Sequence, residues 1–130
     1  MMTYNSLSQE LNTLAYNLQN TDTSFLGVDE ETLQRSIINR LYYALFTRII
    51  DELPQLKASK TGDKHQQIEE RLKKYSNNVT CSNTYRLFRD LKSLRVWADY
   101  EPTKNAPSSN LNNLLTKTYQ VLSYKKIFPN

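Results

Sequence analysis

The sequence has 130 residues, a net charge of +4 and a mean hydropathy of −0.67, which fits one domain that can bury its own core. Two glycines and four prolines are too few for many strands joined by tight turns, so the composition favours long helices. We see no apolar stretch of membrane-spanning length and no signal peptide. The single cysteine, Cys81, excludes an intrachain disulfide and favours a reducing compartment, so we expect a cytoplasmic protein.

The charge is unevenly distributed along the chain. Residues 1–65 carry eight acidic and six basic side chains, whereas residues 66–130 carry five acidic and eleven basic ones. A basic half can meet nucleic acid or an acidic partner. A solvated helix surface explains the same surplus equally well, because no run of lysine and arginine is dense.

Two helices are predicted in the first half of the chain. The first covers residues 6–20, where Ser6 and Gln9 fit a capping box and one face carries Leu7, Leu11, Leu14 and Leu18. The second runs over residues 30–53, between an Asp29 cap and Pro54. Its middle is apolar or aromatic on every side, so we expect it to be the central helix, with Tyr42, Ala44 and Phe46 in or near the core.

Three further helices are predicted after a polar loop at residues 54–62. Asp63 caps one at residues 64–76, the next covers 82–100, and the last runs from 108 to about 127. Short connections between helices of this length imply antiparallel neighbours. The expected fold is therefore all-α, an up-and-down bundle of four to five helices in one domain, residues 1–130.

The common catalytic and cofactor motifs do not occur in this sequence. Two glycines cannot build a Gly-rich phosphate loop, and one histidine with one cysteine argues against a structural zinc site. We therefore predict no cofactor and no metal.

Two polar clusters interrupt the apolar helices. On the second helix one stripe holds Ser36, Arg40, Tyr43 and Thr47. These groups need partners, since unpaired buried polar groups are costly, and a core or interface carboxylate is one alternative for the arginine.

The second cluster ends the fourth predicted helix. Arg95 and Asp99 are four residues apart and can pair, whereas Tyr100 lies about 140° around the axis from Arg95 and faces another surface. A buried ion pair that fixes the last helical turn explains the same residues without a functional role.

Three segments carry a resemblance to a known family. Residues 40–46 read Arg-Leu-Tyr-Tyr-Ala-Leu-Phe, Asp63-Lys64-His65 opens a helix, and Arg95-x-x-Ala98-Asp99-Tyr100 ends another. In this order the segments resemble HEPN-domain proteins, over residues 30–102. The resemblance implies a four- or five-helix bundle that commonly forms a homodimer.

The resemblance also implies function. Many HEPN proteins are metal-independent ribonucleases of toxin–antitoxin and defence systems, with an arginine followed after four to six residues by a histidine. Here Arg95 matches the arginine, but the residue five positions on is Tyr100, and a tyrosine is a poor base at neutral pH. The branch that ends in Ala-Asp-Tyr is often associated with nucleotidyltransferases.

Three hypotheses remain open. The first is a HEPN module that binds RNA or a nucleotidyltransferase partner, with weak or no catalysis. The second is an active ribonuclease, and the third is a helical interaction scaffold. The candidate catalytic residues are Arg95, Asp99 and Tyr100, and the weaker binding candidates are Arg40, Tyr43 and His65. We expect His65 to lie at the surface and a homodimer to place both Arg95 side chains in one groove.

Overall fold

The computed structural model describes residues 4–20, 29–59, 62–100 and 111–129, and within these ranges the chain forms helices and no strand. The order is α1 (Tyr4–Gln19), α3 (Glu30–Asp51), α4 (Pro54–Ala58), α5 (Lys64–Lys74), α6 (Val79–Tyr100) and α7 (Leu111–Leu122). The all-α prediction is confirmed. None of the described helices is long and apolar enough to cross a membrane.

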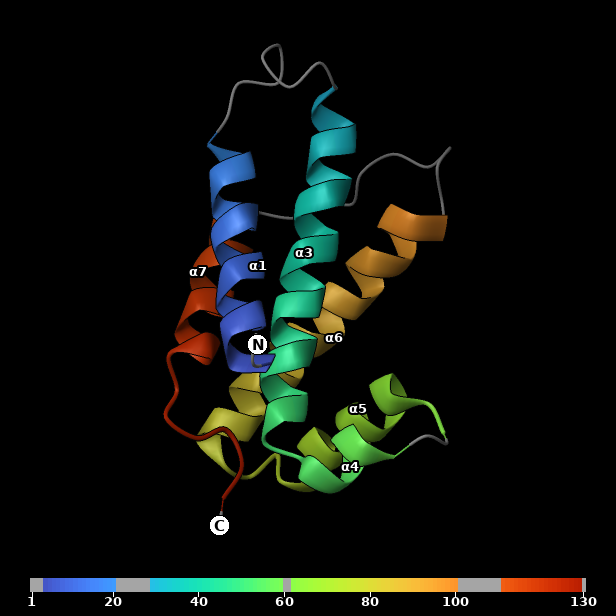
Figure 1. The fold of residues 1–130 in the computed structure, drawn as a ribbon, viewed down its shortest axis with the longest axis vertical. Helices are drawn as coiled ribbons and strands as arrows, with labels where there is room; N and C mark the ends of the chain where they lie inside the picture. Colours follow the sequence, from blue (N-terminus) through green and yellow to red (C-terminus); the bar gives the residue numbers. More distant parts are fainter. Residues whose placement is uncertain (1–3, 21–28, 60–61, 101–110, 130) are drawn as a thin grey trace.

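The long helices form a bundle around α3. Figure 1 shows α1 and α3 side by side and antiparallel, with α7 next to α1. Helix α6, which is as long as α3, crosses α3 obliquely. Helices α4 and α5 lie together at one end of the bundle. Contacts join α3 to α1, α5, α6 and α7, so α3 occupies the centre.

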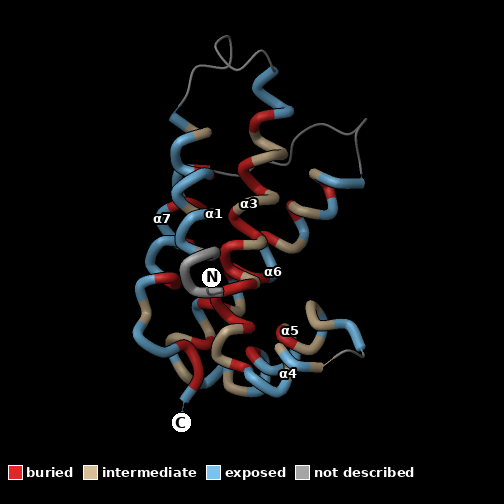
Figure 2. The backbone as a smooth tube through the Cα atoms, in the orientation of Figure 1, coloured by how far each residue is buried: buried red, intermediate tan, exposed pale blue. Residues whose placement is uncertain are grey.

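Helix α3 is the central helix that the sequence predicts. The Asp29 carboxylate caps it by accepting a hydrogen bond from the Thr32 amide at 2.7 Å. Eleven of its 22 residues are buried, and Figure 2 shows the buried stretch along its length. Tyr42 and Ala44 are fully buried and Phe46 is partly buried against the core, as expected.

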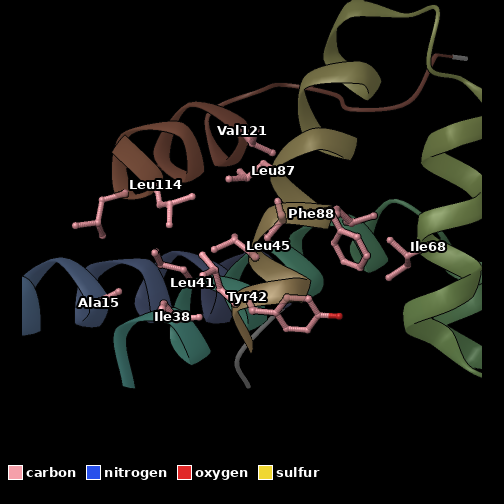
Figure 3. Close-up of a cluster of buried hydrophobic side chains, with 14 of the residues drawn as sticks. Ala15, Ile38, Leu41, Tyr42, Leu45, Ile68, Leu87, Phe88, Leu114 and Val121 are labelled. Atoms are coloured by element: carbon pink, nitrogen blue, oxygen red, sulfur yellow. The ribbon is translucent and has the colours of Figure 1, made fainter. Parts of the chain in front are cut away.

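The core consists of side chains that α3 shares with each of its neighbours. Figure 3 shows Leu41 and Leu45 of α3 facing Phe88 of α6 and Val121 of α7. The Tyr42 ring lies in the same cluster, but its hydroxyl points away from the aliphatic side chains. The core therefore has one polar edge, on the side of α3 that faces α5.

Several predicted boundaries are wrong. Helix α1 already includes Ser6, so Ser6 is not its N-cap. Leu14 was expected in the apolar stripe of α1, yet 40 % of its surface is exposed. The stretch predicted as a polar loop contains the short helix α4, because Pro54 can begin a helix, where its missing N–H is not needed.

The later helices also differ from their predicted bounds. Helix α5 ends at Lys74, two residues earlier than expected, and α6 begins at Val79 instead of Ser82. Helix α7 ends at Leu122, although Ile127 beyond it is still buried. The predicted start of α7 at residues 108–109 lies outside the described residues, as does the side chain of Leu7.

A pair of leucine variants tests the packing. Leu41 is fully buried in the core, so Leu41→Ala should lower the free energy of unfolding by about 2–5 kcal/mol. The matched control is Leu14→Ala on the exposed side of α1, which should change it by no more than about 0.5 kcal/mol. Urea unfolding followed by circular dichroism measures both. Equal effects of the two variants would contradict this arrangement.

Candidate functional site

Four of the predicted site residues meet where α3, α5 and α6 come together. Tyr43 comes from α3, His65 from the first turn of α5, and Arg95 and Asp99 from the last turns of α6. Two residues that the sequence analysis did not select join them, Asn39 and Tyr42. We call the group the Arg95 cluster, defined as Asn39, Tyr42, Tyr43, His65, Arg95 and Asp99.

The Arg95 guanidinium is held among the two tyrosines. Its Nη1 atom donates a hydrogen bond to the Tyr43 hydroxyl at 3.2 Å, and its Cζ lies 5.0 Å from the Tyr42 ring centroid and 5.8 Å from that of Tyr43. Both ring faces attract a cation. The Nε atom of Arg95 is buried without a hydrogen-bond partner among the described residues. Arg95 therefore keeps a fixed position while one of its donors is unused.

Asp99 holds Arg95 only loosely. Its Oδ2 lies 3.7 Å from Nη1 of Arg95, longer than a good hydrogen bond. The same carboxylate accepts hydrogen bonds from the Asn39 amide at 3.3 and 3.4 Å. A partly exposed pair of this kind contributes about 0–1 kcal/mol to stability. The ion pair predicted from the sequence exists, but it does not account for the position of the guanidinium by itself.

His65 lies inside an aromatic cluster, not at the surface as the sequence analysis expected. The Asp63 carboxylate caps α5 by accepting a hydrogen bond from the His65 amide at 3.0 Å. The imidazole stacks on Phe46 at 4.4 Å and on Tyr42 at 5.5 Å between ring centroids. Its Nδ1 atom is hydrogen bonded to the Tyr42 hydroxyl. His65 is therefore half-buried and oriented by α3.

The surroundings of His65 keep it neutral. Burial lowers the pKa of His65 below its ordinary value near 6.5, and the positive charge of Arg95 lowers this pKa further, whereas Asp63 partly opposes both. Burial also raises the pKa of the Tyr42 hydroxyl. Tyr42 thus retains its proton at neutral pH and can donate it to Nδ1 of the imidazole. In that tautomer the other ring nitrogen, Nε2, carries a proton and is a hydrogen-bond donor.

Two of the predicted site residues lie apart from the Arg95 cluster. Arg40 donates from Nη1 to the Ser36 hydroxyl at 2.8 Å, and no carboxylate pairs with it within the described part of the chain. Its Nε atom is buried without a partner in the same residues. Tyr100 is 68 % exposed, and among the described residues no hydrogen bond or ion pair joins it to the cluster. The residues of the polar stripe on α3 therefore do not form one site: Tyr43 contacts Arg95, whereas Arg40 contacts Ser36 on its own helix.

Arg35 is a further polar residue that sequence reasoning missed. Its Nη1 atom donates to the carbonyl oxygens of Trp97 at 2.8 Å and Ala98 at 3.1 Å, and its Cζ lies 4.0 Å from the Trp97 ring centroid. It also pairs with Glu31 at 3.0 Å. This contact ties the end of α6 to α3 and so positions Asp99. The Glu31–Arg35 spacing was the only signal in the sequence, and it did not indicate a contact with α6.

A comparison with known protein families, curated proteins and solved structures found no match for this chain. The described residues contain no group of three histidine, cysteine, aspartate or glutamate side chains that could hold a metal ion. The chemistry of the site therefore has to be inferred from its own geometry.

The geometry suits the binding of an anion. The Arg95 guanidinium, a protonated imidazole nitrogen and the Tyr43 hydroxyl are all hydrogen-bond donors. A phosphate group accepts such bonds, and arginine keeps its charge at every relevant pH. Asp99 is the one carboxylate of the cluster, and its oxygens already accept from Asn39.

The lowered pKa of His65 predicts how stability depends on pH. The unfolded chain takes up the histidine proton near pH 6.5, but the folded chain takes it up only at lower pH. The contribution of His65 to the free energy of unfolding should therefore be constant above pH 6.5 and fall as the pH drops toward the folded-state pKa.

His65→Gln should remove this slope between pH 6.5 and the folded-state pKa, since His65 is the only histidine of the chain. Urea unfolding at a series of pH values measures it. The matched variant Tyr42→Phe, which removes only the hydroxyl, should raise the pKa of His65 in an NMR titration. A His65 pKa at or above its ordinary value in the unmodified protein would contradict the structure.

Proposed function

We propose that this chain is a HEPN-type helical module of a toxin–antitoxin or defence system. On this proposal it binds RNA, a nucleotidyltransferase partner or both through the Arg95 cluster, in the cytoplasm, with weak or no catalysis of its own. The proposal combines the sequence resemblance with the anion-binding geometry of the cluster.

The observation that carries the proposal is the meeting of three separate segments. The tyrosine pair of α3, the histidine that opens α5 and the arginine near the end of α6 are the residues on which the resemblance rests. In the fold Tyr43, His65 and Arg95 lie in one cluster. A hydroxyl, an imidazole and a guanidinium in one cluster can contact the same ligand, which supports the proposal.

An active ribonuclease is the second candidate, and the proximity of His65 and Arg95 favours it. In such an enzyme the arginine stabilises charge on the phosphate and a neighbouring group exchanges a proton with the ribose hydroxyl or the leaving oxygen. His65 is the only imidazole available for that step. Its Nδ1 is engaged by Tyr42, however, so a free lone pair would require a change of tautomer.

RNA binding by Arg95→Ala tests the proposal. Loss of a charged donor typically costs about 1.5–3 kcal/mol, so the dissociation constant for a single-stranded RNA should rise about 10- to 150-fold in fluorescence anisotropy. The matched control is Arg86→Ala, an exposed arginine on the same helix that donates a hydrogen bond to the Ser82 hydroxyl and lies outside the Arg95 cluster. It should change the constant by less than about threefold.

Melting temperatures of the same proteins separate function from stability. If Arg95→Ala and Asp99→Ala both lower the melting temperature while the folded Arg95→Ala protein binds RNA normally, Arg95 has a structural role only. RNA fragments that form in the presence of EDTA, and that Arg95→Ala abolishes, would instead establish the ribonuclease.

The proposed homodimer places the two Arg95 side chains in one groove with α6 near the two-fold axis. Val96 and Tyr100 on the outer side of α6 are 40 % and 68 % exposed, and aromatic residues are enriched in interface cores. Light scattering should give twice the 15.3 kDa mass of the chain, and Val96→Glu should halve the measured mass. A monomer at high micromolar concentration would contradict this assembly.

A further inference from the structure

A second surface of the molecule lies between α1 and α7, on the side of α3 away from α5 (Figure 1). A hollow of about 610 Å³ is lined by residues of both helices, and its volume is within the range of ligand sites. The described residues that line it are all uncharged, and most are amides, hydroxyls or tyrosines, including Asn12, Tyr16, Asn112, Thr116 and Tyr119. Most of the surface that these residues expose in the hollow is nevertheless apolar, with polar groups among it, and such a wall suits a neutral ring with hydrogen-bonding edges.

Two tyrosines line this hollow with their rings largely in solvent. Tyr16 of α1 is 58 % exposed and Tyr119 of α7 is 66 % exposed. Most described aromatic side chains pack against the core, and Tyr16 and Tyr119 share their exposure only with Tyr100 at the end of α6. Exposed aromatic rings are the surfaces on which unpaired bases stack in proteins that bind single-stranded nucleic acid.

One buried polar atom in the hollow lacks a partner. The Oδ1 atom of Asn12 is out of contact with water and accepts no hydrogen bond from the described residues. Such an atom is costly unless a ligand satisfies it. Asn12 also lines an adjoining hollow of about 190 Å³, together with Gln9 and Ser123. The uncharged surface thus continues along α1 and α7.

The far end of this surface is basic. Gln9 and Leu122 line both the adjoining hollow and a third one of about 600 Å³, whose wall includes Lys125 and Lys126. The acidic residues of that wall are already paired. Asp51 accepts from Lys57 at 3.0 Å, and Glu52 pairs with Arg48 at 2.6 Å. Lys125, which is exposed, therefore adds positive charge where a ligand would meet this wall.

We infer that the surface between α1 and α7 binds a segment of single-stranded RNA. Bases stack on Tyr16 and Tyr119 and present their edges to the amides, while a phosphate lies at Lys125. The choice of RNA rests on the proposed function, but the surface is separate from the Arg95 cluster. A docked peptide helix would need a row of apolar pockets, whereas Leu115 is the one aliphatic residue among the described residues that line the main hollow.

Binding of a fluorescent single-stranded RNA of about 12 nucleotides to the full chain tests this inference. Stacking is worth about 1–3 kcal/mol per base, so Tyr119→Ala should raise the dissociation constant about 5- to 150-fold. Tyr119→Phe keeps the ring and should stay within about twofold. Because Tyr119 is exposed, neither variant should lose the helical circular dichroism signal.

The salt dependence of binding tests the basic end. Lys125→Ala should reduce the slope of log K against log salt by about 0.7, the value for one phosphate contact on a single strand. Lys117→Ala is the matched control, because Lys117 lines a different hollow on α7 and should leave the slope unchanged.

The outcomes distinguish this surface from the Arg95 cluster. Normal binding by both Tyr16→Ala and Tyr119→Ala, with weakened binding by Arg95→Ala, overturns the inference and leaves the proposed function standing. Weakened binding by the tyrosine variants, with normal binding by Arg95→Ala, supports the inference and removes the cluster as the RNA site. No binding by the unmodified chain at any salt concentration overturns the inference.

Discussion

Burial of α3 on nearly every side is the constraint on which the other contacts depend. Polar groups within a buried helix cannot reach water, so each must find a partner on a neighbouring element. The Tyr42 hydroxyl reaches His65 of α5, and the Tyr43 hydroxyl reaches Arg95 of α6. The same aromatic stretch that forms the centre of the core therefore also fixes the donors of the Arg95 cluster. Fold and site cannot be varied independently in this region.

At the C-terminal end of α3, buried polar side chains likewise find partners, here in the last described residues of the chain. Arg48 donates to the Tyr124 carbonyl at 2.8 Å, and the Glu52 carboxylate accepts from the amides of Ile127 and Phe128 at 2.8–3.1 Å. This pair, buried to more than four fifths, holds a segment that has no regular structure of its own. The anchoring places the adjacent lysines beside α1, which is why the uncharged surface there has a basic end.

The sequence alone allowed contacts within a helix to be predicted, but it did not allow contacts between helices to be predicted. The spacing of Arg95 and Asp99 predicted their pair, and the apolar run predicted that α3 is central. The contact between Tyr43 and Arg95 depends on the oblique crossing of α3 and α6, which no local pattern encodes. His65 was misplaced at the surface for the same reason, because its stacking on Phe46 requires α5 to fold back on α3.

The partners of each polar group explain why the cluster should bind a phosphate better than it cleaves an RNA chain. A general base needs a free lone pair near its substrate, but Tyr42 engages Nδ1 of His65 and Asn39 engages the Asp99 carboxylate. What remains is a fixed cation with hydrogen-bond donors. Such a group can hold a phosphate and stabilise its charge, but it cannot take the proton from a ribose hydroxyl. A catalyst built on this fold would need an imidazole released from its tyrosine.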